Sequence, residues 1–333
     1  MEKFFEYKNF FTEIEQIPVL PILDNANSNF KYTFAIPTYS RPETLDQTLQ
    51  SIINQKTNVE YNILISDNNP QRDDTTEQLI NDKYRSTPNL SYYKNTKNIG
   101  ASGNWNRLLL LCKTDYLVLI HDDDVLAECY LNDIDRIQRK YPQASGINVL
   151  KKRWNGAPSV KIEESATKAN VLRNTVFSNF NFFTFGAQTG CLLKVSDLKE
   201  TGGFRSDIAY SFDYQNVLYM CLKNKMMLTY QKELLMYRCV NNTSSTISCQ
   251  LKQLEEDILI HQQIADAVSM PSWYVKFVCW LSSKLRLIRI ENSEQASSTY
   301  KYYPSNFFSV ILYKLLYWLH CIWVKLYYKI DRI

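Results

Sequence analysis

Three consecutive carboxylates, Asp122, Asp123 and Asp124, directly follow the largely apolar run 116–121. Such a run predicts a buried strand, and open α/β sheets form their ligand sites at the carboxyl ends of such strands. Three negative charges in one place are costly unless a cation shares them, and Mg²⁺ or Mn²⁺ held against phosphate groups would do so. A solvated acidic turn that caps the next helix is the alternative, because aspartate is also a favoured N-cap residue.

Further candidate site residues, most of them polar, lie near the ends of neighbouring predicted strands. They are Pro37, Thr38, Tyr39 and Arg41 at the end of strand 32–37, Asp67 after strand 61–66, and Asn98, Gly100 and Asn106 before strand 115–121. Parallel strands open their carboxyl-end loops on one edge of a sheet, so a single pocket can collect these side chains.

The elements that must position these residues alternate between strands and helices. Strands are predicted over 32–37, 61–66, 90–94 and 115–121, and helices over 41–55, 75–84, 101–113, 129–141 and 212–223. This alternation predicts an α/β fold with an open, mostly parallel, Rossmann-like sheet and helices on both faces. Within residues 143–195, short strand-like segments at 146–151 and 190–195 flank a stretch rich in Asn and Phe.

Composition excludes several function classes. Among 333 residues, Lys and Arg exceed Asp and Glu by only four, which is too few to indicate nucleic-acid binding. The eight cysteines show no CxxC pair or zinc spacing, so reduced thiols are expected, and neither a GxSxG nor a GxxxxGK[ST] motif occurs. The N-terminus lacks the basic and apolar regions of a secretion signal, so we expect a cytoplasmic protein.

Two aromatic and basic segments, 271–290 and 307–333, follow an amphipathic helix expected over 251–268. On a helix of about 100° per residue, an arc of roughly 60° holds four basic residues of the second segment, namely Lys314, Lys325, Lys329 and Arg332. One basic stripe beside aromatic side chains predicts a helix that lies in an anionic membrane interface. Packing against the core or against another subunit is the alternative, and the interrupting charges disfavour a membrane span.

The ordered motifs resemble glycosyltransferase family 2, whose members are inverting enzymes of the nucleotide-diphosphate-sugar transferase (GT-A) fold with a DxD motif. The matching segments are IPTYSRPETL (36–45), ILISDNN (63–69), NIGASGNWNRLL (98–109), DYLVLIHDDDV (115–125) and GGFRSDIAYSFDYQNVLYM (202–220). Each segment alone is a weak signal, but five in the family's order make the resemblance specific.

The resemblance implies nucleotide-sugar contacts from ten residues. These are Pro37, Thr38, Tyr39, Arg41, Asp67, Asn98, Gly100, Asn106, Asp122 and Asp123. Asp67 would accept a hydrogen bond from the N3–H of a uracil or thymine ring, with a turn-forming role in Asp-Asn-Asn-Pro as the alternative. Trp105 stands where the family often has arginine, so this position lacks a basic side chain.

The resemblance also makes Asp124 the direct ligand of a Mn²⁺ or Mg²⁺ ion. Asp122 would assist through the ribose or a bridging water, and Asp123 has either a nucleotide contact or a structural role. One cation with few protein ligands, completed by phosphate oxygens and waters, suits either metal. It would act as a Lewis acid toward the departing diphosphate.

Inverting transfer needs a base that takes the proton of the acceptor hydroxyl. The family places an acidic residue after a Gly-Gly-Phe turn, and here Asp213 is the first candidate and Asp207 the second. Phe212 replaces the glutamate that usually precedes this residue. A structural role for Asp213 in the first turn of a helix is the alternative. Gly190 and Cys191 are expected on the acceptor side.

The resemblance therefore implies a metal-dependent inverting glycosyltransferase. It would move one sugar from a UDP- or dTDP-sugar to a hydroxyl of a lipid-linked saccharide in bacterial surface-polysaccharide (O-antigen or capsule) synthesis. The absence of Q-x-x-R-W disfavours a processive enzyme, and the absence of a G-G-x-G-x-R loop disfavours a nucleotidyltransferase. A non-catalytic nucleotide- or saccharide-binding protein of the same fold, within a polysaccharide-assembly complex, is the alternative.

We accordingly expect three parts. They are an N-terminal arm (1–31), a catalytic domain (32–245) with a nucleotide-sugar half (32–125) and an acceptor half (126–245), and a helical region (246–333) that associates with the inner face of the cell membrane. Nothing in the sequence sets the oligomeric state.

Overall fold

A computed structural model describes residues 3–155, 169–240 and 246–291, together with 311, 314–316, 318, 319 and 322. The predicted interfacial helix 307–333 therefore lies mostly outside the described residues, and Lys314 is the one member of its basic stripe inside them. No helix within the described ranges combines the length and the apolar character that a membrane crossing requires.

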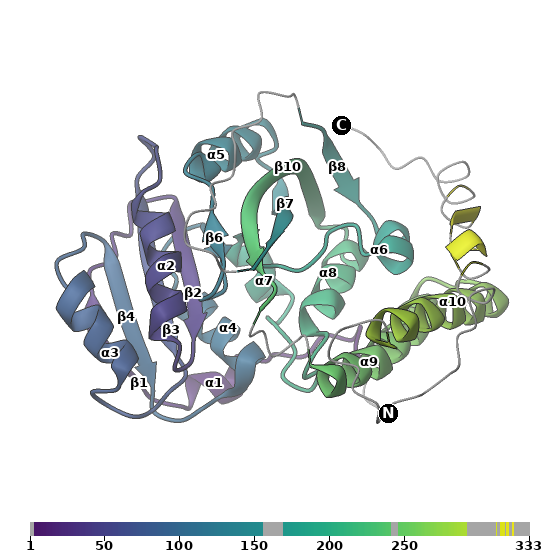
Figure 1. The fold of residues 1–333 in the computed structure, drawn as a ribbon, viewed down its shortest axis with the longest axis horizontal. Coiled ribbons are helices and arrows are strands. Elements are labelled where there is room, and N and C mark those ends of the chain that lie inside the picture. The colour runs from purple at the N-terminus through teal and green to yellow at the C-terminus, as the bar shows by residue number, and fades with distance from the viewer. Residues whose placement is uncertain are drawn as a thin grey trace.

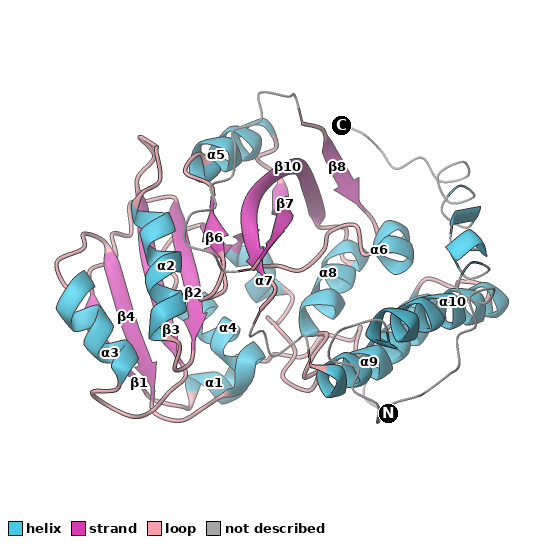
Figure 2. Ribbon diagram, in the orientation of Figure 1, coloured by secondary structure: helices cyan, strands magenta, loops and turns pink. Residues whose placement is uncertain are grey.

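The central sheet has a parallel half and a mixed half, and most of its strands are labelled in Figures 1 and 2. The strand order is β1-β4-β3-β2-β5-β9-β7-β10-β6, with β8 paired to β10. The parallel strands are β2 (Tyr32–Thr38), β3 (Tyr61–Asp67), β4 (Leu90–Asn95) and β5 (Tyr116–Leu119). The others are β1 (Val19–Asp24), β6 (Val125–Leu126), β7 (Ala144–Trp154), β8 (Val171–Asn174), β9 (Cys191–Lys194) and β10 (Met226–Arg238). Strand β9 runs antiparallel to both β5 and β7, and so joins the two halves.

Helices cover both faces of the sheet, as the alternating pattern predicts. One core cluster includes residues of α2 (Pro42–Ile53), η1 (Ile80–Tyr84) and α5 (Tyr130–Lys140). The other includes residues of α4 (Gly100–Leu111), α7 (Val195–Glu200), α8 (Phe212–Leu222), α9 (Ile247–Ala267) and α10 (Ser272–Glu291). The shorter helices are α1 (Thr12–Glu15), α3 (Thr75–Leu79) and α6 (Val176–Phe182). The α/β fold with helices on both faces is thus confirmed.

Both ends of the described chain pack onto the predicted catalytic domain. Residues 3–31 contain α1 and the edge strand β1, and Phe4 and Phe11 are buried in the same core cluster as α8. Ile260 and Ile264 of α9 belong to this cluster too, and α9 lies beside α10 (Figure 1). The helices after residue 245 therefore share the core of the central domain.

Candidate active site

The loop after β5 is tied to the loop after β2. The parallel register of β2 and β5 pairs Ala35 with Leu119. Three residues further along each segment, Thr38 therefore lies beside Asp122. The Thr38 hydroxyl donates to Asp122 Oδ2 at 2.7 Å. Arg41 Nη1 lies 3.0 Å from Asp123 Oδ2 and 3.5 Å from Asp122 Oδ1. Burial raises the pKa of Asp122 to about 6, which the Thr38 bond and the Arg41 charge oppose.

Asp124 is fully buried and held by residues of the mixed half of the sheet. The Thr189 hydroxyl donates to its Oδ2 at 2.6 Å, and the backbone N–H of Arg238 donates to its Oδ1 at 3.0 Å. Burial, and then the neighbouring charge of Asp123, raise the pKa of Asp124 to about 7. A carboxylate packed this way is costly to keep ionised without a cation.

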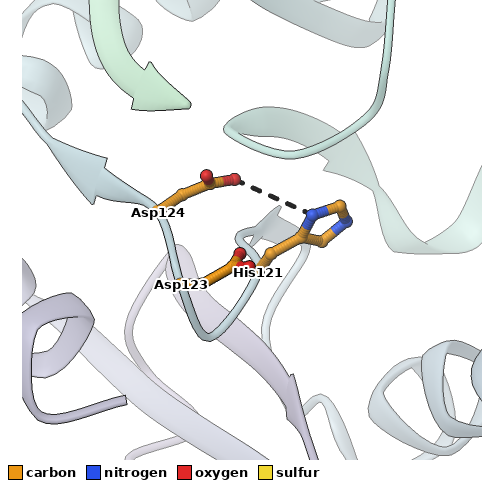
Figure 3. A group of neighbouring side chains, drawn as sticks. All are labelled: His121, Asp123 and Asp124. Atoms are coloured by element: carbon orange, nitrogen blue, oxygen red, sulfur yellow. Dashed lines mark ion pairs between the residues drawn. The ribbon is translucent and has the colours of Figure 1, made fainter. Parts of the chain in front are cut away.

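Three side chains form a cluster that fits a divalent cation, namely His121, Asp123 and Asp124 (Figure 3). Their ligand atoms all lie within 4.8 Å of one another, and His121 Nδ1 is 3.7 Å from Asp124 Oδ2. Burial lowers the pKa of His121, which favours the neutral imidazole that binds metals. One imidazole and two carboxylates suit Mn²⁺, whereas Mg²⁺ prefers oxygen ligands alone.

This cluster differs in membership from the pair that the sequence suggests. Asp124 lies in it as expected, but Asp122 turns toward Thr38 and Arg41, and His121 and Asp123 take its place. In the sequence, His121 directly precedes the three aspartates. This position could have identified it as a metal ligand, but the prediction from the sequence did not include it. The assignment of Asp122 as an assisting ligand stays a prediction.

Asp213 lies in the first turn of α8 and is half-buried. Burial raises the pKa of Asp213 to about 6, and the nearby His121 is among the groups that oppose the shift. Its Oδ1 accepts from the backbone N–H of Tyr214 at 2.8 Å. A carboxyl whose pKa is raised by burial, within electrostatic reach of His121, has the properties of a general base.

The second candidate base, Asp207, is engaged in a structural ion pair. Arg205 donates to both of its oxygens, at 2.8 and 2.6 Å, and Lys8 lies 3.3 Å away. The Arg205 guanidinium is itself enclosed by the rings of Phe4 and Phe10. This geometry favours Asp213 over Asp207, although the identity of the base stays a prediction.

Asp67 is buried with both carboxylate oxygens in use. Lys94 and Tyr92 each donate to Oδ2 at 2.7 Å, and the backbone N–H of Asn69 donates to Oδ1 at 2.9 Å. Burial raises the pKa of Asp67, while these donors oppose the shift. Since neither Asp67 nor Lys94 has exposed surface, the predicted contact with a nucleotide base requires the surrounding side chains to move, and it stays a prediction.

The remaining residues of the first motifs occupy distinct places. Tyr39 follows β2 and is 52% exposed, and Pro37, two residues earlier, is half-buried. Asn98 accepts from the backbone N–H of Gly100 at 2.9 Å, and Gly100 has a φ of +75°, which favours glycine there. Asn106 exchanges two hydrogen bonds with the backbone of Phe204, at 2.7 and 2.8 Å. Asn106 therefore holds the loop that leads to Asp213.

The acceptor-side candidates lie inside the sheet. Cys191 opens β9 and is fully buried, and burial raises the pKa of its thiol to about 12. Gly190 has a φ of +69°, and an added Cβ would meet Leu235 at 2.5 Å. Their proposed acceptor contact stays a prediction.

Sequence reasoning missed three further residues around the site, and it noted Trp105 only as a departure from the family pattern. Thr189 and the backbone of Arg238 hold Asp124, and the Arg238 guanidinium donates to the backbone oxygen of Asp123 at 2.9 Å. Lys151 on β7 is electrostatically close to Asp124 and Asp213, which oppose the lowering of its pKa by burial. Trp105 packs under His121, with ring centroids 5.6 Å apart.

Comparison with known proteins agrees with this architecture. Residues 33–196 match the family described as Glycosyl transferase family 2. The abequosyltransferase RfbV of Salmonella typhimurium is 39% identical over 99 residues, which cover 29% of this chain and 29% of that protein. The match thus spans less than a third of that relative's length.

Solved structures show the same fold at low sequence identity. TarS residues 1–349 of S. aureus superpose with a TM-score of 0.57 and 15% identity, over 88% of this chain and 79% of that one. The same TarS fragment in complex with UDP-GlcNAc gives 0.58 and 16%, over 78% and 73%. The mannosyltransferase PcManGT of Pyrobaculum calidifontis, in complex with GDP-Man and Mn²⁺, gives 0.55 and 12%, over 94% and 92%. The expected GT-A fold and the family resemblance are confirmed.

Proposed function

Since the chain carries a glycosyltransferase domain of family 2 over residues 33–196, we propose that it is a metal-dependent inverting enzyme. It moves one sugar from a UDP- or dTDP-sugar to a hydroxyl of a lipid-linked saccharide in surface-polysaccharide synthesis. The observation that carries the proposal is the cluster of His121, Asp123 and Asp124 close to the half-buried carboxyl of Asp213.

The metal site rests on the chemistry of the chain's own donors. His121, Asp123 and Asp124 would hold Mn²⁺ or Mg²⁺, and the bound ion would supply Lewis-acid stabilisation of the departing diphosphate. Thr38 holds Asp122 through a hydrogen bond, and Arg41 lies between the carboxylates of Asp122 and Asp123. We propose that Asp122 and Arg41 contact the nucleotide, as the resemblance implies.

Asp213 accepts the proton of the acceptor hydroxyl during a single displacement at the anomeric carbon. The attacking oxygen loses its proton to a carboxylate oxygen of Asp213 as the bond to the nucleoside diphosphate breaks. With a pKa near 6, most of the Asp213 population is ionised at neutral pH and still basic enough to take this proton.

The donor class is supported by what the similar proteins bind. Two TarS structures are complexes, one with UDP-GlcNAc and one with UDP, and PcManGT was solved with GDP-Man. The name of RfbV states abequosyl transfer. These names support a nucleotide-activated sugar as the donor. They include both uridine and guanosine nucleotides, so they do not select the nucleotide for this chain.

Metal-dependent donor turnover tests the proposal. The full-length protein would be incubated with UDP-, dTDP- and GDP-sugars, with Mn²⁺, Mg²⁺ or EDTA, and the released nucleoside diphosphate would be measured. We expect turnover of at least one UDP- or dTDP-sugar with a metal, loss of turnover in Asp124→Ala, and wild-type rates in the exposed control Asp82→Ala. Absence of turnover and of transfer with every donor would favour the non-catalytic alternative.

Peripheral binding to the inner face of the membrane is the second part of the proposal. Among residues 311, 314–316, 318 and 319, which the structure describes, four apolar side chains are each exposed at about half of their surface, namely Ile311, Leu315, Trp318 and Leu319. Apolar side chains near a basic stripe are typical of interfacial helices. Removal of residues 307–333 should abolish sedimentation with vesicles that contain anionic lipid. Unchanged sedimentation would instead favour docking onto a polysaccharide-assembly complex.

A further inference from the structure

Glu256, on α9, binds the loop that carries the candidate base. Its Oε1 accepts from the backbone N–H of Ala209 at 2.9 Å, and its Oε2 accepts from those of Tyr210 and Ser211 at 2.8 Å each. Three consecutive backbone donors directed at one carboxylate form an anion-binding concavity, with charge-assisted hydrogen bonds. Asp213 follows the last of these donors by two residues.

The start of α8 depends on this contact because its own cap is incomplete. Ser211, the N-cap residue, makes no side-chain cap hydrogen bond. Glu256 binds its backbone N–H from outside the helix and places a negative charge near the helix N-terminus, where the dipole favours it. The conformation of the turn that presents Asp213 is therefore set by a side chain from the C-terminal region.

Helix α9 is itself firmly attached to both of its neighbours. The Tyr214 hydroxyl and His261 Nε2 are 3.1 Å apart, which joins α9 to α8 one residue after Asp213. Arg286 of α10 pairs with Asp257, the residue after Glu256. These contacts hold the segment of α9 that carries Glu256 in place through bonds other than those to residues 209–211.

We propose that Glu256 is a positioning residue of the active site, which holds residues 209–211 so that the Asp213 carboxyl faces the acceptor hydroxyl. The inference rests on the proposed role of Asp213 as the base. It also assigns α9 to the catalytic unit, whereas the sequence suggested a separate membrane-associating region from residue 246. Glu256 does not touch the reacting atoms and acts through the loop.

Three variants test the role of Glu256. Glu256→Ala removes all three hydrogen bonds, whereas Glu256→Gln keeps one carbonyl oxygen that can accept from Tyr210 and Ser211. Glu255→Ala, at the exposed neighbouring position, is the matched control. Donor turnover would be measured at saturating Mn²⁺ with a sugar nucleotide that the wild type uses, and amide hydrogen exchange would be followed over residues 205–214.

We expect kcat to fall about 10- to 100-fold in Glu256→Ala, because a misplacement near 1 Å has effects of this size. KM for the donor should stay within twofold, since the donor binds at the Thr38 and Arg41 side. Glu256→Gln should be intermediate, and only the Glu256 variants should lose amide protection over 209–211. A kcat equal to that of Glu255→Ala, or unchanged protection, would overturn the proposal.

The same experiments distinguish failure of the proposed function from failure of the proposed role of Glu256. If the wild type turned over no donor, the function would fail on its own, and hydrogen exchange would still decide whether Glu256 holds the loop. If Glu256→Ala did not fold, the comparison of Glu256→Gln with Glu255→Ala would decide the effect on kcat. A parallel loss of kcat and of Mn²⁺ affinity in Glu256→Gln would indicate general disruption, and it would overturn the positioning role.

Discussion

Replacement of Asp213 by asparagine removes the proton acceptor while nearly preserving the side-chain shape. The amide can keep the 2.8 Å bond from the Tyr214 N–H through its carbonyl oxygen, so the turn of α8 should be retained. General bases contribute about 10²- to 10⁴-fold to a rate, and we expect a loss of that size in kcat. Donor and Mn²⁺ binding should be unchanged, because Asp213 is outside the cluster of Figure 3.

The pH dependence of the rate is a second, independent test of Asp213 as the base. Burial raises the pKa of Asp213 to about 6, and the active form is the carboxylate, so activity is lost as the pH falls through this value. The ionised fraction is roughly nine-tenths at pH 7, one half at pH 6 and one-tenth at pH 5 for a single titrating group. The wild-type rate should therefore fall about tenfold between pH 7 and pH 5.

The assay follows release of the nucleoside diphosphate from pH 5 to pH 8, at saturating Mn²⁺ so that the cation keeps its carboxylate ligands ionised. In Asp213→Asn the acid limb near pH 6 should disappear together with most of the rate. A variant that retains more than a tenth of the wild-type kcat, or that keeps the same acid limb, would refute the assignment of Asp213. In that case Asp207→Asn would be the next variant to measure.

Three further outcomes are expected. Asp124→Ala should abolish Mn²⁺-dependent nucleotide binding in calorimetry, and retention of that binding would contradict the role of the cluster. Lys94→Met leaves the buried Asp67 without its cation, so the free energy of unfolding should fall by about 3–5 kcal/mol in urea denaturation, whereas the exposed control Lys97→Met should change it little. Trp105→Ala removes a ring that is 6% exposed and should lower stability by about 3–5 kcal/mol; a loss below 1 kcal/mol would show that the ring is not tightly packed.

The parallel half of the sheet was predictable because its strands are short apolar runs separated by regular helices. Strand β10 was not predicted, and its pairing explains why. Its register against β7 shifts between Tyr230 and Glu233 and again before Leu235, so no simple alternation of apolar and polar residues survives. Strand β1 contains Pro21 and a similar irregularity, which an edge strand tolerates and which hides the strand pattern.

The contacts of the site also fall into those that the sequence could predict and those that it could not. Strands β2 and β5 are adjacent and parallel, and their register brings Thr38 next to Asp122. The sequence motifs were therefore sufficient to predict that the ends of these two strands meet. Thr189 and Arg238 reach Asp124 from beyond the parallel half, through β9 and β10. Their approach depends on antiparallel pairing between segments more than sixty residues apart, and no local pattern encodes that.

The two departures of this chain from the family pattern turn out to be in contact. Trp105 stands in place of arginine and Phe212 in place of glutamate, and their ring centroids are 4.8 Å apart in a T-shaped arrangement. Trp105 also packs edge-on against Phe204, at 5.0 Å. An arginine at this buried position would need an anion beside it, which Phe212 cannot supply. Each aromatic residue is therefore compatible with the other. The pair forms a chain of ring contacts from His121 of the metal cluster, through Trp105, to Phe212, the residue directly before Asp213.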